Sequence, residues 1–242
     1  MNRRAFVAFS AIASFAGSVS ATEFVPGGSA FIQDREHFDE LAFAAKLGRT
    51  ATIRQVYQNV SYRPTGLNNI KNALNGLQFG FGFEPNQIAI AAANNGPSSA
   101  YTFSDYIWSK YRIGEYYSLI DGDGKSIVCN LNLRRTTEVN GPADPNLETS
   151  RFQDKSIEAL QSRGVVFMTC HTSVEELAVG LVERKFAPAG LEPLAVAADI
   201  LTHLIDGAVV VPSMAATIGV LQQRYGIHTS RFSRGQRHPA AF

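Results

Sequence analysis

The chain lacks the sequence signatures of the common metal, nucleotide and triad sites. Its 242 residues include only two cysteines and five histidines, and none of these has the spacing of a zinc site. The sequence contains no G-x-x-x-x-G-K-[ST] phosphate loop and no G-x-G-x-x-G fingerprint, and Ser213 has no G-x-S-x-G elbow around it. We therefore expect no metal site, no cofactor and no hydrolase triad.

The chain also has little charge, and neither sign dominates. Charged residues make up 18% of the sequence and hydrophobic residues 45%, which fits a soluble globular protein and excludes a disordered one. The length fits one sizeable domain, or one domain with an insertion. Residues 1–21 contain Arg3 and Arg4 and no acidic residue, so their removal changes the formal net charge from +1 to −1. We expect no nucleic-acid partner.

Residues 1–21 have the pattern of a targeting segment. Arg3 and Arg4 precede an apolar, uncharged stretch that is too short for a comfortable transmembrane helix, and small residues ending at Ala21 predict cleavage there. The arginine pair and the residues after it resemble a twin-arginine signal; an ordinary secretory leader is the alternative. No later run is long enough to span a bilayer. We therefore expect export to a bacterial periplasm and no stable membrane insertion.

The predicted export to an oxidising compartment means that the two cysteines could be bonded to each other instead of free. Cys129 and Cys170 could form a disulfide there, closing a loop of about 40 residues and stabilising the fold by a few kcal/mol. Such a bond would also remove the free thiol. The sequence leaves both states of the cysteines open.

The stretch 164–176 carries the strongest local signal in the chain. Residues 165–168 are a short unbroken apolar run, which is typical of a strand covered on both faces. Two capping-box spacings follow, starting at Thr172 and Ser173, and they predict the start of a helix. Cys170 is thus expected between a strand end, where sites gather, and a helix start, which stabilises a thiolate. An inert, half-buried cysteine in a turn is the alternative.

Strand patterns alternate with helix patterns along most of residues 51–232. The expected strands are residues 53–60, 87–93, 165–168, 208–211 and 227–232. Apolar residues recur at helical spacing between them, for example Leu67, Ile70 and Leu74. This alternation predicts an α/β fold, with a mainly parallel five-stranded sheet and helices on both faces.

Three segments fall outside this alternation. Residues 22–50 are expected to form an N-terminal arm, with a helical stripe of Phe38, Leu41, Ala42 and Ala45 as its docking face. Residues 112–150 are expected to be an insertion that contains a β-hairpin, with its turn at residues 121–124. Residues 233–242 are expected to be a flexible tail.

Three strand-to-helix turns are expected to open on one edge of the sheet. They are Asn94-Asn95-Gly96, Cys170-His171-Thr172 and Pro212-Ser213. We predict that Cys170 is the reactive group of this crevice and His171 its proton partner, and that Asn94, Asn95, Thr172 and Ser213 contact a ligand. The two asparagines could instead only shape their turn.

Two segments resemble a known family. Residues 164–170, followed by a helix, resemble the cysteine-bearing strand and turn of DsrE/DsrF-like proteins, and residues 205–218 resemble the final strand and helix of that family. The resemblance implies a small α/β domain over residues 51–232 that assembles into homotrimers or hexamers. It also implies that a cysteine at the position of Cys170 carries a persulfide between proteins.

Two functions remain open at this point. The first is an exported, periplasmic carrier of sulfur on Cys170, working by sulfur transfer or thiol redox chemistry with a donor or acceptor protein. The second is a non-enzymatic, oligomeric module whose crevice holds a small molecule or a haem-like group, with Cys170 or His171 as ligand. In a purely structural alternative, Cys170 is bonded to Cys129.

Overall fold

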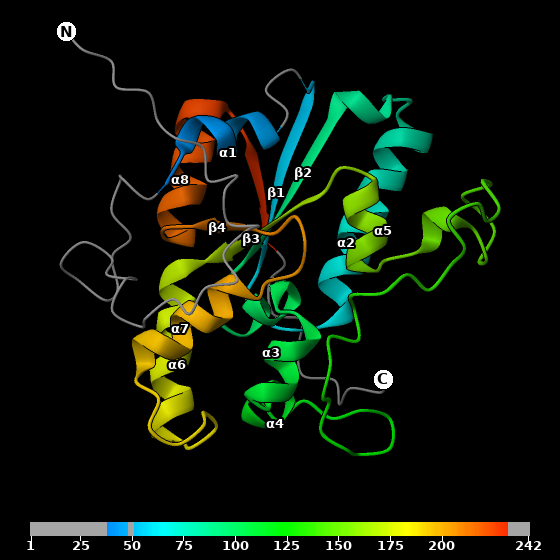
Figure 1. Ribbon diagram of the computed structural model, residues 1–242. Coiled ribbons are helices and arrows are strands. Elements are labelled where there is room, and N and C mark those ends of the chain that lie inside the picture. Colours follow the sequence, from blue (N-terminus) through cyan, green and yellow to red (C-terminus); the bar gives the residue numbers. More distant parts are fainter. Residues whose placement is uncertain (1–37, 48–50, 232–242) are drawn as a thin grey trace, which may run out of the picture.

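A five-stranded, all-parallel sheet forms the centre of the molecule (Figure 1). The computed structural model describes residues 38–47 and 51–231. The strands are β1 (Ile53–Asn59), β2 (Ile88–Asn94), β3 (Val166–Cys170), β4 (Val209–Val211) and β5 (His228–Arg231), and their order in the sheet is β4-β3-β2-β1-β5. The predicted α/β fold is therefore confirmed, with strand ends that differ from prediction by no more than two residues.

Eight α-helices accompany the strands in the described residues. They are α1 (Glu40–Lys46), α2 (Pro64–Asn75), α3 (Asp105–Lys110), α4 (Ile113–Tyr116), α5 (Ile157–Ser162), α6 (His171–Glu183), α7 (Pro193–Thr202) and α8 (Met214–Tyr225). A 3₁₀ segment, Gly96–Thr102, connects β2 to α3. Gly226 ends α8 in the left-handed conformation that favours glycine, at φ 60°. No helix within this part of the chain is both long and apolar enough to cross a membrane.

The order of the strands explains why the helices cover both faces. The chain steps from β1 to β4 in one direction and then crosses back to β5. Because crossovers between parallel strands are right-handed, the reversed step brings α8 to the opposite face from α2 and α6. The side chains follow this division, since Phe167 packs with the α2 and α6 layer whereas Met168 and Cys170 pack with α8. Figure 1 shows α1 and α8 on one side of β1 and β2, and α2 and α5 on the other.

The N-terminal arm contributes α1 to the second face. Asp39 caps this helix, and its Oδ1 accepts a hydrogen bond from the backbone N–H of Ala42 at 2.9 Å. Phe43 and Leu47 are buried in the α8 layer, whereas Leu41 is 71% exposed. The predicted docking stripe is therefore wrong apart from Phe38, which packs against that layer. The predicted leader at residues 1–21 and the predicted tail at residues 233–242 lie outside the described residues.

The insertion at residues 112–150 does not show the expected hairpin ladder. Its turn is closed by a single isolated antiparallel bridge between Ile120 and Ser126. The following residues leave the strand conformation because Asn130 turns into the core, where its amide donates to the carbonyl groups of Tyr101 at 2.8 Å and Phe103 at 3.2 Å. These side-chain hydrogen bonds take the place that a second strand would have filled.

Candidate functional site

The carboxyl ends of β3 and β4 form the topological switch point of the sheet. These neighbouring strands lead into helices on opposite faces, because β3 continues into α6 and β4 into α8. The connections therefore diverge, which is the place where open α/β sheets form their ligand crevices. Cys170, the last residue of β3, pairs in register with Val211, the last residue of β4. Cys170 thus lies at the position that sheet topology favours for a site.

Two helix starts surround the sulfur atom of Cys170. Cys170 is itself the N-cap of α6, and its Sγ accepts a hydrogen bond from the backbone N–H of Met214, the first residue of α8, at 3.3 Å. Helix starts stabilise negative charge through unpaired N–H groups and the helix dipole. The rest of the surroundings is apolar and includes Val211 and Ile218, and Cys170 is only 4% exposed. The Met214 N–H therefore reaches the sulfur, whereas the apolar surroundings restrict the access of other molecules to it.

Hydrogen bonds tie the three turns of this edge together. The Thr172 hydroxyl donates to the carbonyl of Pro212 at 3.0 Å, and the backbone N–H of Gly96 donates to the Ser173 hydroxyl at 3.2 Å. Ser213 is the N-cap residue of α8, where its carbonyl accepts from the backbone N–H of Thr217 at 2.8 Å. Thr172 therefore links the start of α6 to the turn before α8, whereas the hydrogen bond of Ser213 lies within α8.

A buried histidine and glutamate follow Cys170 on α6. His171 is 1% exposed and Glu175 is 3% exposed, and Nδ1 of His171 lies 3.5 Å from Oε2 of Glu175. Neither carboxylate oxygen of Glu175 has a hydrogen-bond partner in the described structure. Burial raises the pKa of Glu175 to about 7. His171 and Glu175 are therefore a buried titratable pair at the start of α6, which begins at the residue after Cys170.

Asn94 and Asn95 have different environments. Asn94 is fully buried, where its Oδ1 accepts from the side chain of Asn59 at 3.0 Å and its Nδ2 donates to the carbonyls of Ala92 at 3.2 Å and Met168 at 3.0 Å. It therefore ties β1, β2 and β3 together below the crevice. Asn95 is half-buried, and its Oδ1 has no hydrogen-bond partner among the described residues.

Both cysteines are free thiols in this structure. Cys129 lies in the insertion and is half-buried. Burial raises the pKa of the Cys129 thiol, and the nearby carboxylate of Asp105 raises it further. The structure therefore shows the free-thiol state of the two that the sequence left open.

Two hollows in the surface lie away from Cys170. One, of about 60 Å³, lies at the carboxyl end of β1, where Asn59, Arg63 and Thr65 line it. The other is a groove of about 440 Å³ between α3, α5 and the connection from α7 to β4. Neither is lined by Cys170 or His171.

The sequence did not identify Glu175 or Met214 as parts of the site. Both predicted capping boxes are wrong, because α6 starts at His171 and its N-cap is Cys170. The spacing of four residues between His171 and Glu175 was the available signal for a shared helix face. The backbone N–H of Met214 has no sequence signal, since only the fold brings it to the sulfur.

Comparisons with known proteins give no relative to set beside this geometry. No family model, no curated protein and no solved structure matches the chain.

Proposed function

We propose that this protein is an exported, DsrE/DsrF-like carrier of sulfur on Cys170. The observation that carries the proposal is the hydrogen bond from the Met214 N–H to the Cys170 sulfur at the switch point of the sheet. Thiolates and persulfide anions are stabilised by N–H donors at helix starts. The resemblance of residues 164–170 to the cysteine-bearing turn of that family supports the same assignment.

The proposed step transfers one sulfur atom from a low-molecular-weight persulfide, R–S–SH. The Cys170 thiolate attacks the outer sulfur of the donor, a new S–S bond forms at Cys170, and the donor's S–S bond breaks. The donor leaves as the thiolate R–S⁻ with the bonding electron pair, so the step needs no oxidant or reductant. In this proposal His171, paired with Glu175, exchanges the proton that converts the thiol to the thiolate.

The test measures sulfur uptake by mass spectrometry after incubation with cysteine persulfide. The Cys129→Ser variant should gain one sulfur atom that dithiothreitol removes, and the Cys129→Ser/Cys170→Ser variant should gain none. A sulfur atom that stays bound in the double variant, or no uptake in the single variant, would sink the proposal.

A matched pair of variants tests the hydrogen bond itself. Met214→Pro removes the N–H at the first position of α8, where proline is tolerated, and Met214→Ala removes the same side chain but keeps the N–H. Since a hydrogen bond to a charged group contributes about 1.5–3 kcal/mol, Met214→Pro should take up sulfur about tenfold or more slowly than Met214→Ala. Equal rates would show that this N–H has no role.

Export and assembly are further parts of the proposal. The mass of protein recovered from the periplasm should correspond to cleavage after Ala21, and replacement of Arg3 and Arg4 by lysine should block export by the twin-arginine route. Native mass spectrometry should show a homotrimer or homohexamer, as the resemblance implies. A monomer would remove the assembly from the proposal and leave the thiol chemistry in place.

The binding module is the alternative function, and burial does not separate it from the sulfur carrier. Both functions require a molecule to reach Cys170 or His171, and these side chains are 4% and 1% exposed. An absorption spectrum of the purified protein separates the haem version, because bound haem gives a Soret band and the sulfur carrier gives none.

A further inference from the structure

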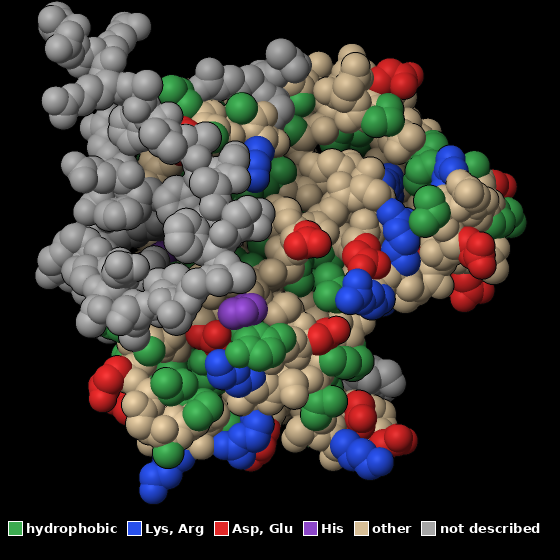
Figure 2. Space-filling view, viewed as in Figure 1, with side chains coloured by type: hydrophobic (Ala, Val, Ile, Leu, Met, Phe, Trp, Pro, Cys, Tyr) green, Lys and Arg blue, Asp and Glu red, His purple; other side chains and the backbone are tan. Residues whose placement is uncertain are grey.

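The groove of about 440 Å³ has the size of a small-molecule site. Its walls are the N-terminal residues of α3, the outer face of α5 and residues 204–206, which follow α7. In Figure 1, α3 lies below the centre of the view and α5 lies above and to the right of it. Figure 2 shows Asp and Glu side chains near the centre of the same face, with Lys, Arg and hydrophobic side chains among them. The groove is separate from Cys170.

The groove has a fixed floor. The backbone N–H of Ile205 donates to Thr102 at 2.8 Å, and that of Ser104 donates to His203 at 3.2 Å. An antiparallel bridge between Phe103 and Leu204 lies between these two hydrogen bonds. The segments before α3 and after α7 are thus joined before any ligand arrives, so little ordering entropy opposes binding.

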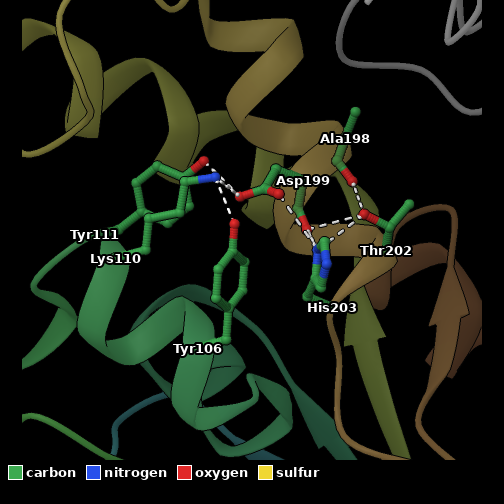
Figure 3. A network of polar contacts seen from close by, with 7 residues as sticks. All are labelled: Tyr106, Lys110, Tyr111, Ala198, Asp199, Thr202 and His203. Atoms are coloured by element: carbon green, nitrogen blue, oxygen red, sulfur yellow. Dashed lines mark hydrogen bonds and ion pairs between the residues drawn. The ribbon is translucent and has the colours of Figure 1, made fainter. Parts of the chain in front are cut away.

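A polar network holds the rim of the groove, as Figure 3 shows. Asp199 accepts from Lys110 at 2.9 Å and from Tyr111 at 2.7 Å, and Lys110 also donates to the Tyr106 hydroxyl at 2.7 Å. The Tyr106 ring, which lines the groove, packs on His203 with 4.6 Å between ring centroids. Because Asp199 neutralises Lys110, this network adds no free positive charge to the groove.

Among the other charged residues that line the groove, carboxylates outnumber cations. Arg134 and Glu158 form an ion pair at 2.7 Å. Two other carboxylates line the groove, Asp105 from α3 and Asp206 from the connection to β4, and neither has an ion-pair partner within the described residues. The Ser104 hydroxyl oxygen is also buried at the groove, with no hydrogen-bond partner among those residues. Asp105 Oδ1 already accepts a hydrogen bond from the backbone N–H of Asn130 at 2.9 Å. The groove thus offers two carboxylates without an ion-pair partner in the described residues, of which Asp105 is already hydrogen-bonded, and one unused hydroxyl.

We propose that this groove binds a small organic cation, with one or two ammonium groups on an apolar chain. The carboxylates of Asp105 and Asp206 bind the ammonium groups, and the Ser104 hydroxyl accepts one further N–H. The apolar chain packs on Leu204 and Ile205. An anion is disfavoured because Arg134, the groove's own cation, is already paired with Glu158.

The test compares three linear molecules of the same length by isothermal titration at low ionic strength. Putrescine carries two ammonium groups, 1,4-butanediol is its neutral analogue and succinate is the anionic one. Putrescine should bind saturably and more weakly as salt is added, and the other two should not bind. Equal binding of 1,4-butanediol, binding of succinate, or no saturable binding of putrescine would overturn the proposal.

Aspartate-to-asparagine variants test whether putrescine binds in this groove. Asp105→Asn and Asp206→Asn should each weaken putrescine binding about threefold, and the double variant about tenfold, as partly exposed ion pairs do. Asp123→Asn is the matched control, because this exposed aspartate lies in the turn of the insertion, and it should bind as the parent does. The Asp206 side chain has no hydrogen bond within the described structure, so its variant keeps the fold. Unchanged affinity in the double variant would place the binding elsewhere.

Discussion

Glu175 places a carboxyl group where almost no water reaches it. The residue is 3% exposed, and its Oε2 lies 3.5 Å from Nδ1 of His171. Burial disfavours the ionised form, which explains why the pKa of Glu175 is raised to about 7. Glu175 therefore exchanges its proton near neutral pH.

The same shift has a consequence for stability. An unfolded glutamate titrates near pH 4.3, whereas Glu175 in the folded chain keeps its proton up to about pH 7. Its contribution to the free energy of unfolding is therefore complete below pH 4.3 and is lost as the pH rises towards 7. Relative to Glu175→Gln, the parent should lose about 2–4 kcal/mol between these limits, measured by urea unfolding across the pH range.

The neighbouring residue supplies the control for this titration. Glu176 follows Glu175 on α6 and is exposed, so Glu176→Gln should keep the pH profile of the parent. If Glu175→Gln and the parent lose stability in parallel over this range, the burial of the carboxyl group does not set the profile.

At the scale of elements, the start of α6 shows what local sequence could not supply. The hydroxyls of Thr172 and Ser173, which resemble caps in the sequence, are used in tertiary hydrogen bonds to Pro212 and Gly96. The helix therefore begins earlier, at His171. A capping pattern identifies side chains that can accept a hydrogen bond from a backbone N–H. Which N–H groups lie within reach of those side chains depends on the packing of the whole structure.

Within the insertion, the contact between α4 and the backbone at Ile127 depends on one glycine. A Cβ added at Gly114 would lie 1.9 Å from the backbone oxygen of Ile127, and backbone cannot yield as a side-chain tip does. Gly114→Ala should lower the free energy of unfolding by about 1–3 kcal/mol in urea titrations, because the backbone at Ile127 must move away from α4. Hydrogen exchange should accelerate at the Ile127 amide, which donates to Leu119.

Replacement of a second helical glycine, Gly219, by alanine is expected to stabilise the protein. A Cβ at Gly219, in the middle of α8, meets no atom within 4 Å. Gly219→Ala should therefore stabilise the protein by about 0.5–1 kcal/mol through helix propensity alone. Destabilisation of both variants to the same extent would contradict the close approach at Gly114.

For the whole molecule, the sheet could be predicted and the surroundings of the site could not. Strands β2 and β3 were found within two residues because each is a largely apolar run that is buried along most of its length and bounded by turn residues, as in Ile88–Asn94. Cys170 was placed correctly at a strand end for the same reason. This reason does not extend to β1 and β5, whose sequences IRQVYQN and HTSR are largely polar. Glu175, the Met214 N–H and the groove beside Ser104 depend on contacts between segments far apart in the chain, which periodicity does not report.

The N-terminal arm provides the last case, because its helix completes the second face of the sheet. Phe43 is 4% exposed in the layer of α8, and Arg224 at the end of α8 pairs with Glu40 at 2.8 Å. Phe43→Ala should lower the free energy of unfolding by about 2–3 kcal/mol, less than a central Phe→Ala, because α1 can detach as a unit. Leu41→Ala, on the exposed side of the same helix, should change it by less than about 0.5 kcal/mol. Equal effects of the two variants in urea unfolding would mean that α1 is an appendage, and the second face would then be closed by α8 alone.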